Sequence, residues 1–368
     1  MSDYFIGLMS GTSSDGVDAA LVEFTPAPRL RSSHFLSYSP DLRAHILDFA
    51  AGHYHGDAVD ELGRLDTELG ELFAAAALAL ISKTGITVSD VRAIGSHGQT
   101  VRHRPDTPQP FTLQIADPNI IAARTNIVTV ADFRRRDVAL GGQGAPLVPA
   151  FHRAVFANHK ETRAVVNIGG IANITVLPAG DGTVSGFDTG PGNVLMDLWS
   201  RKHLQQPHDA NGEFAASGRI DTGLLEEFLA DDYFSRAVPK STGREHFNQA
   251  WLSEKLINRK LSAADVMATL CELTARSISD AVVQHARGIK QVLLCGGGAH
   301  NAHLYKRLID HLRGCTLVST EVFGIPPDWV EAVAFAWLAR ETLAERAGNL
   351  PAVTGAKQPA VLGAVYHI

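Results

Sequence analysis

Gly186-Phe187-Asp188-Thr189-Gly190-Pro191-Gly192-Asn193 is the most informative stretch of this chain. A short β-prone segment at residues 183–185 precedes it, and residues 194–199 follow with apolar side chains at helical spacing. The pattern predicts a strand, a glycine-rich turn and a helix in immediate succession. Such a turn leaves backbone N–H groups at the helix start that can hold phosphate oxygens. Asp188, at the carboxyl end of the strand, suits a general base or a magnesium partner, or it only caps the helix.

The composition describes a folded globular chain. Its 368 residues exceed one ordinary core, so two domains are expected, and 45% of them are hydrophobic. A formal net charge of -6 argues against a general affinity for nucleic acid or acidic membranes, so neither is expected as a partner.

The cysteines and the start of the chain bear on its location. Cys271, Cys295 and Cys315 have no CxxC spacing, which is typical of reduced core residues in a cytosolic protein. Residues 1–4 show no secretory leader, and the longest apolar run, residues 72–81, is too short to span a bilayer. We therefore expect a cytoplasmic protein.

A β-hairpin is predicted at the start of the chain, with strands at residues 4–9 and 17–24. Its turn, residues 10–16, holds two glycines, four hydroxyl side chains and Asp15. Such a turn can present amides and hydroxyls to a phosphate as a P-loop does, although the Walker A motif is absent. The alternative is an ordinary solvated turn.

Two further loops of the first half follow predicted strands. A strand at residues 91–95 leads into His97 and Gln99, which could bind sugar hydroxyls or an amide, or could make only structural hydrogen bonds. A strand at residues 127–130 leads into three arginines, of which Arg134 is the candidate for binding an anion or a sugar. The glycine-rich segment 141–146 is typical of a flexible joint, and we expect the chain to cross between domains there.

The second half repeats this pattern. Strands are predicted at residues 164–168, 173–177 and 183–187, so the halves are expected to be structural duplicates. The polar loop 239–245 could hold anions or simply link helices.

The last third of the chain contains a glycine run and two terminal elements. A strand at residues 291–295 ends in three glycines; Asn301 breaks the dinucleotide fingerprint, but glycines still let a flat ring such as adenine approach. His300 and His303 have no acidic partner nearby in sequence, so no metal cluster is expected. Asp328 is expected to cap a helix with Glu331 in its first turn, and residues 351–368 to return to the first domain as a strand.

Together, the three loops resemble the nucleotide site of the superfamily of acetate and sugar kinases, heat-shock chaperones and actin. Five motifs narrow the resemblance to the anhydro-N-acetylmuramic acid kinase family: FIGLMSGTSSDGVD at residues 5–18, GSHGQT at 95–100, DFR at 132–134, GGQGAPL at 141–147 and NIGGIAN at 167–173. The similarity extends over essentially the whole chain.

The resemblance implies an α/β fold of two ribonuclease-H-like domains with a cleft between them, as in actin-like ATPases and sugar kinases. We expect one domain at residues 1–131 plus 352–368 and the other at residues 132–351. It also implies ATP and a sugar as substrates, Mg²⁺ bound with ATP rather than by a protein cluster, and a homodimer.

The implied activity is that of a phosphotransferase with an alcohol acceptor. ATP and water would convert 1,6-anhydro-N-acetylmuramic acid to N-acetylmuramic acid 6-phosphate and ADP, in peptidoglycan recycling and amino-sugar catabolism. Because O6 is tied up in the anhydro bridge, water must attack C1 while the bridge opens, and Asp188 fits the general base.

The resemblance also assigns the binding residues. His97, Gln99, Arg134, Asp137 and Glu331 are expected to contact the sugar. ATP is expected to contact Gly11, Thr12, Ser13, Ser14, Asp15, Gly16, Val17, Asp18, Gly190, Gly192, Asn193, Gly296, Gly297 and Gly298.

Other functions of the same superfamily remain alternatives. Another sugar kinase or a phosphatase would use the same loops, and an ATP-gated binding protein would usually carry a large appended domain. A serine hydrolase is disfavoured because neither Ser13 nor Ser96 lies in a GxSxG motif.

Overall fold

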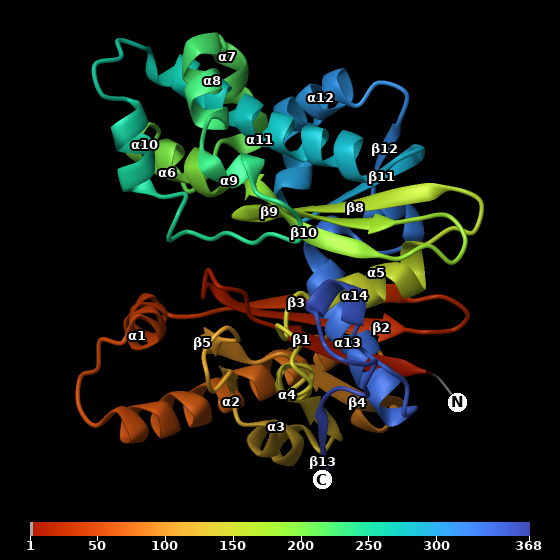
Figure 1. The fold of residues 1–368 in the computed structure, drawn as a ribbon. Coiled ribbons are helices and arrows are strands. Elements are labelled where there is room, and N and C mark those ends of the chain that lie inside the picture. Colours follow the sequence, from red (N-terminus) through yellow and green to blue (C-terminus); the bar gives the residue numbers. More distant parts are fainter. Residues whose placement is uncertain (1–2) are drawn as a thin grey trace. The chain divides into compact units, whose positions relative to one another are not determined.

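The structure, a computed structural model, describes residues 3–368 (Figure 1); Met1 and Ser2, part of the segment searched for a leader, lie outside the described residues. The chain forms two compact units. Unit 1 contains the described residues up to Val155, together with Phe323–Ile325 and Trp329–Ile368, and unit 2 contains Phe156–Val322 and Pro326–Asp328. This division differs from the expected one, because residues 132–155 and 329–351 belong to unit 1.

Unit 1 is built on a six-stranded sheet of order β13-β7-β4-β1-β2-β3. The first three strands form an antiparallel meander, β4 and β7 run parallel to β1, and β13 pairs antiparallel with β7. The strands are β1 (Tyr4–Met9), β2 (Gly16–Glu23), β3 (Arg29–Ser37), β4 (Val91–Ser96), β7 (Thr129–Ala131) and β13 (Ala364–Tyr366), and a separate ribbon pairs β5 (Gln99–Arg104) with β6 (Phe111–Ile115). The predicted hairpin at the start of the chain is confirmed.

The two faces of this sheet pack against different helices, because side chains alternate along a strand. Ile6 and Ile94 point into a core shared with α2 (Ala58–Ser82). Their neighbours Gly7 and Gly95 face α13 (Val330–Leu343), where an added Cβ atom would overlap the carbonyls of Ala332 and Phe335. The absence of side chains at these two glycines therefore lets α13 lie directly on β1 and β4.

Helix α1 of unit 1 begins and ends at residues with capping chemistry. Ser39 accepts a hydrogen bond from the Leu42 amide at the start of α1, and Gly52 ends that helix in the left-handed conformation with φ 90°. The remaining helices of unit 1 are α1 (Pro40–Ala51), α3 (Pro118–Thr125), α4 (Arg135–Ala139), α5 (Val148–Phe156) and α14 (Pro351–Thr354).

The glycine-rich segment 141–146 is not the crossing between units, so that prediction is wrong. The Gln143 amide donates to the Thr354 carbonyl at 2.7 Å, and the Gly144 amide donates to Asp137 at 2.8 Å. Both bonds hold the segment inside unit 1. The chain crosses into unit 2 after Val155, near the end of α5.

Unit 2 repeats the strand order of unit 1. Its sheet has the order β10-β9-β8-β11-β12, in which the first three strands form a meander and β11 and β12 run parallel to β8. The order β3-β2-β1-β4-β7 in unit 1 is the same, which confirms the predicted duplication and the two ribonuclease-H-like units. The strands are β8 (Thr162–Ile168), β9 (Ile171–Leu177), β10 (Ser185–Pro191), β11 (Ile289–Cys295) and β12 (Thr316–Ser319).

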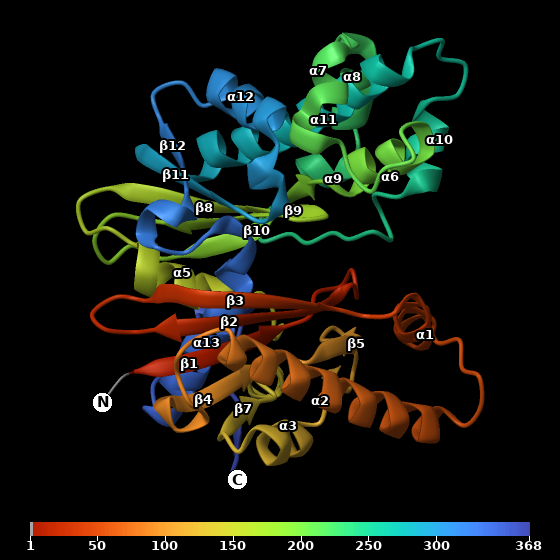
Figure 2. The same cartoon turned by 180° about the vertical axis from the view of Figure 1, so that it is seen from behind.

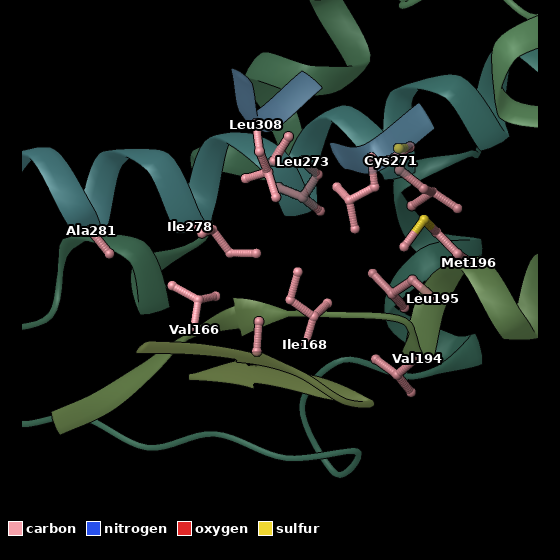
Figure 3. Close-up of a cluster of buried hydrophobic side chains, with 14 of the residues drawn as sticks. Val166, Ile168, Val194, Leu195, Met196, Cys271, Leu273, Ile278, Ala281 and Leu308 are labelled. Carbon is pink, nitrogen blue, oxygen red and sulfur yellow. The ribbon is translucent and has the colours of Figure 1, made fainter. Parts of the chain in front are cut away.

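Helices α7, α8, α11 and α12 lie over one face of this second sheet in both views (Figures 1 and 2). Figure 3 shows Val166 and Ile168 pointing from the sheet toward Leu273, Ile278 and Leu308. The helices are α6 (Val194–His203), α7 (Glu213–Ser217), α8 (Thr222–Leu229), α9 (Asp232–Ser235), α10 (Gln249–Lys255), α11 (Ala263–His285) and α12 (Ala302–His311).

Two expectations for the end of the chain need correction. Asp328 does not cap the helix: it lies in the short turn Pro327–Trp329, its carboxylate pairs with His300 at 2.8 Å, and α13 begins at Val330. The terminal strand exists but covers only Ala364–Tyr366. Within residues 3–368, no helix has the length and apolar character needed to cross a membrane.

Candidate active site

Asp188 lies in the middle of β10 (Ser185–Pro191) and not at its carboxyl end as expected, and the strand changes register against β9 between Asp188 and Gly190. Gly190 has φ 152°, and a methyl group there would lie 2.8 Å from the ring of Phe234. Glycine is therefore required at this bend, which turns the chain directly after the carboxylate.

The backbone of Asp188 is held from two sides. Its amide donates to the Lys240 carbonyl at 3.0 Å, and its own carbonyl accepts from the Tyr233 hydroxyl at 2.6 Å. The Thr242 amide donates to Oδ2 at 3.0 Å, whereas Oδ1 accepts no hydrogen bond from residues 3–368. One carboxylate oxygen is thus fixed and the other remains able to accept a proton.

Burial raises the pKa of Asp188 to about 6, and the Glu245 charge adds to the rise while the Thr242 hydrogen bond opposes it. A carboxylate with a pKa near neutrality is a better proton acceptor than an ordinary aspartate. The geometry and the pKa both suit a general base.

The turn after Asp188 is hydrogen-bonded to the turn between β8 and β9. The amides of Gly192 and Val194 donate to the Gly170 carbonyl at 2.9 and 3.0 Å, and the Asn193 amide donates to Gly169 at 2.8 Å. A Cβ atom at Gly192 would overlap the Gly169 carbonyl. The two turns therefore form one close-packed corner at the start of α6. The amides of Gly192, Asn193 and Val194 are used inside this corner, so they are not free to bind phosphate as expected.

A cavity of about 440 Å³ lies beside this corner within unit 2. The structure brings together there three of the predicted ATP residues, namely Asn193, Gly297 and Gly298. The cavity is also lined by Met196, Asp197, His208, Asp209, Ala210, Asn211, His300 and Asn301. Gly190, Gly192 and Gly296 shape the neighbouring turns instead.

The sequence did not single out Asp197 as a site residue. Its only signal was its position one helical turn after Asn193, which places both on one face of α6. Burial raises the pKa of Asp197 to about 6, against the opposing charges of Arg201, His208 and Arg244.

The hairpin turn of unit 1 is held by a chain of hydrogen bonds. The hydroxyl of Tyr38 donates to Ser10 Oγ at 3.2 Å, and Ser10 donates to Gln99 Oε1 at 2.7 Å. Gln99 Nε2 then donates to the Gly11 carbonyl at 3.2 Å. Gln99 is therefore placed to position the turn, and its oxygen is not available to a sugar.

Only part of the hairpin faces outward. Thr12 and Asp15 are exposed, and Gly11 and Ser13 are partly exposed. Val17 lies in the hydrophobic core of unit 1, so its side chain cannot contact ATP as expected.

His97, Arg134 and Glu331 come together in unit 1. Arg134 donates to His97 Nε2 from Nε at 3.0 Å and from Nη2 at 2.9 Å, and Nη1 donates to the Gly144 carbonyl at 2.9 Å. Burial lowers the pKa of Arg134 to about 10, with the charge of Glu331 opposing, and burial raises the pKa of Glu331. Burial and the Arg134 charge hold the pKa of His97 well below its ordinary value, so the imidazole is neutral and carries its proton on Nδ1.

Asp137 is fully buried, and both of its carboxylate oxygens are engaged. Oδ2 accepts from the Gly144 amide, and Oδ1 accepts from Asn349 Nδ2 at 2.7 Å and from Thr354 Oγ1 at 2.8 Å. These bonds join three segments of unit 1. The expectation that Asp137 contacts the sugar is therefore not supported.

Within residues 3–368, no group of three or more His, Cys, Asp or Glu side chains is placed to hold a metal ion. A metal bound with the phosphates of a nucleotide needs only one or two carboxylates from the protein, so the residues present fit that arrangement.

The family model for anhydro-N-acetylmuramic acid kinase matches residues 3–368. The chain belongs to this family. The anhydro-N-acetylmuramic acid kinase of Xanthomonas axonopodis pv. citri (strain 306) is 51% identical over 369 residues, which cover 99% of this chain and 98% of that protein. The relative of the same name from Coxiella burnetii (strain Dugway 5J108-111) is 48% identical over 363 residues, covering 98% of this chain and 97% of its own. Membership of the anhydro-N-acetylmuramic acid kinase family confirms the predicted enzyme class, a phosphotransferase.

Solved structures resemble the chain more distantly. A ROK family glucokinase from Streptomyces griseus, in complex with glucose and AMPPNP, covers 92% of this chain and 99% of its own, with 13% identity and a TM-score of 0.42. The strand order that the two sheets share defines the fold.

Proposed function

We propose that the chain is an ATP-dependent kinase that opens the anhydro ring of 1,6-anhydro-N-acetylmuramic acid with water and phosphorylates O6. The products are N-acetylmuramic acid 6-phosphate and ADP, formed in cell-wall recycling. The observation that supports this most directly is the free Oδ1 of Asp188, on a carboxyl of raised pKa next to the glycine-rich corner of unit 2.

In this reaction, water attacks C1 of the sugar and gives a proton to Asp188 Oδ1. The C1–O6 bond breaks at the same time, with positive charge developing at C1. O6 then forms a bond to the γ-phosphorus of ATP, and ADP leaves. The Thr242 amide holds Oδ2 throughout, so the carboxylate keeps its orientation while it accepts the proton.

The hairpin of unit 1 would bind ATP phosphates through the backbone amides and hydroxyls of residues 11–15. Tyr38, Ser10 and Gln99 would keep the turn in shape. Mg²⁺ bound with the phosphates offsets the charge on the phosphoryl oxygens. Asp15, the exposed carboxylate of the turn, is the side chain that we propose would help to hold it.

The sugar would be bound in unit 1 by His97, Arg134 and Glu331. The guanidinium of Arg134 offers donors to hydroxyl and carbonyl oxygens, His97 holds that guanidinium through Nε2, and Glu331 offers an acceptor. The location in the cytoplasm and the homodimer remain predictions.

Asp188→Asn tests the general base directly. The amide cannot accept the water proton, so kcat should fall by about 10²–10⁴-fold while ATP and the sugar still bind. Asp181→Asn, an exposed aspartate in the same unit, is the matched control and should keep full activity. A loss of activity that high Mg²⁺ restores would instead make Asp188 a metal partner.

Isotope labelling tests the order of bond changes. With H₂¹⁸O, the label should enter at C1 of the product and be absent from the phosphate, because water attacks the sugar and O6 attacks ATP. ADP release should also require the anhydro sugar and should not occur with sugars that carry a free O6. Label in the phosphate would mean that ATP is hydrolysed by water, and would overturn the proposed reaction.

A further inference from the structure

The polar loop 239–245, between α9 and α10, is fixed against the Asp188 strand. It supplies the Lys240 carbonyl and the Thr242 amide to Asp188, each at 3.0 Å. Lys240 Nζ donates to the carbonyls of Tyr233 and Phe234 at 3.0 and 3.1 Å, which ties the loop to α9. The loop is therefore more than a link between helices, and its remaining polar side chains are held close to the glycine-rich corner.

Arg244 follows Thr242 by two residues and extends to that corner. A methyl group added at Gly170 would lie 3.6 Å from Nη2 and 3.8 Å from Nε of Arg244, and 3.9 Å from Val194 Cβ. The guanidinium thus lies beside the turn whose carbonyl binds the amides of Gly192 and Val194. Because Gly170 has no side chain, nothing at that position covers the guanidinium.

The side chain of Arg244 has no hydrogen-bond or ion-pair partner within residues 3–368, whereas two other arginines of unit 2 are held by carboxylates. Arg259 pairs with Asp221 and Glu227, and Arg307 pairs with Glu272 and Asp310. The side chain of Arg244 makes no hydrogen bond and no ion pair there, and it is exposed. Its charge nevertheless acts on Asp197, which lines the cavity of about 440 Å³.

A guanidinium with unused donors is suited to two parallel hydrogen bonds with an oxyanion. Arg244 lies beside the Gly170 turn that packs on the start of α6, and its charge reaches Asp197, which lines the cavity. We infer that Arg244 binds phosphate oxygens of ATP. This inference rests on the proposed function and adds to it a residue that no sequence motif assigned.

With this role for Arg244, one loop would contact both the proposed base and the nucleotide. Thr242 orients the base that acts on the sugar, and Arg244 binds the nucleotide whose negative charge shifts toward the leaving group during transfer. Arg244 makes or breaks no covalent bond. Its effect is to stabilise charge on the bound phosphates.

Nucleotide titrations with the full-length chain and Mg²⁺ test this role. Arg244→Gln should weaken binding of a non-hydrolysable ATP analogue by about 10–100-fold, the usual loss for a charge-assisted hydrogen bond, and leave adenosine binding unchanged. Arg244→Lys should restore part of the affinity. Arg219→Gln, at an exposed arginine of the same unit, should bind the analogue as the wild type does.

Equal analogue affinity for Arg244→Gln and the wild type would overturn the role of Arg244 while leaving the proposed function intact. A variant that loses affinity only for the sugar would also overturn it, because Arg244 would then bind the sugar carboxylate. Failure of the wild type itself to bind the analogue would overturn the proposed function and this inference together.

Discussion

Asp188 is partly buried and Asp137 is fully buried, and their hydrogen-bond surroundings differ. Both oxygens of Asp137 accept hydrogen bonds, from three donors in total, so neither oxygen faces a ligand. Asp188 accepts from one donor with one oxygen. Since a carboxylate with few donors holds its proton more readily when it is desolvated, the pKa of Asp188 is raised, in keeping with the proposed role as a base.

The charge of Glu245 raises the pKa of the proposed base Asp188, and this effect can be measured as a pH profile. The raised pKa of Asp188, about 6, means that the proton-accepting form is lost as the pH falls through that value. Glu245→Gln removes a negative charge that raises this pKa, so the acidic limb of the kcat/KM profile should move to lower pH. Glu254→Gln, at an exposed glutamate of unit 2, should leave the limb in place.

The direction of this shift is the decisive result. A limb that moves to higher pH in Glu245→Gln would mean that the limb does not report Asp188.

At the scale of elements, the glycines on the α13 face of the unit 1 sheet determine how closely that helix packs. A Cβ atom at Gly7 would overlap the Ala332 carbonyl, and backbone cannot move aside as a flexible side chain can. Gly7→Ala should therefore lower the free energy of unfolding by about 1–3 kcal/mol, as overpacked core substitutions do. Denaturant titration gives this value.

Gly63→Ala is the matched control for that substitution. Gly63 is exposed within α2, and a Cβ atom there would meet no atom within 4 Å. It should raise the stability by about 0.5–1 kcal/mol, because alanine loses less backbone entropy in a helix. A Gly7→Ala variant as stable as Gly63→Ala would show that α13 can shift without cost.

Elements with local signals could be predicted from the sequence, and contacts between distant segments could not. Ser39, Pro40 and Gly52 specify both ends of α1 through their own backbone and capping chemistry. The role of Asp137 depends on Asn349 and Thr354, which lie 212 and 217 residues away in the sequence. Nothing near Asp137 in the sequence distinguishes such a residue from a solvent-exposed acid.

The same limit applies to the candidate site. The Asp188 turn could be identified because its strand, glycines and helix are consecutive in the sequence. Tyr38, in contrast, reaches Ser10 of the hairpin because β3 pairs with β2. Val17 shows the reverse error: it is next to the hairpin turn in sequence, but strand alternation directs its side chain into the core.

At the scale of the whole molecule, the two units differ in whether their cores come from one continuous stretch of the chain. The main core of unit 2 draws on residues between Ala164 and Leu317, an almost continuous stretch. Unit 1 needs α13 and β13 from the end of the chain to complete its sheet and cover one face. The two units therefore share a strand order but differ in the continuity of the chain that forms them.

A fragment of residues 156–328 should fold by itself, with a cooperative thermal transition in circular dichroism. A fragment of residues 1–155 should not, because it lacks the helix that covers Gly7 and Gly95 and the strand that pairs with β7. Addition of residues 323–368 to the shorter fragment should restore folding. A cooperative transition in residues 1–155 alone would contradict this account.

The bond between Asp137 and Thr354 has a consequence for the chain while it is being synthesised. The two residues are 217 positions apart, and all of Phe156–Val322 leaves the ribosome between them. The unit that begins to emerge first is thus completed last, after its neighbour has had time to fold. Until α13 arrives, the bare glycine face of β1 and β4 is open to incorrect partners, so this interval is when the nascent chain most needs a chaperone.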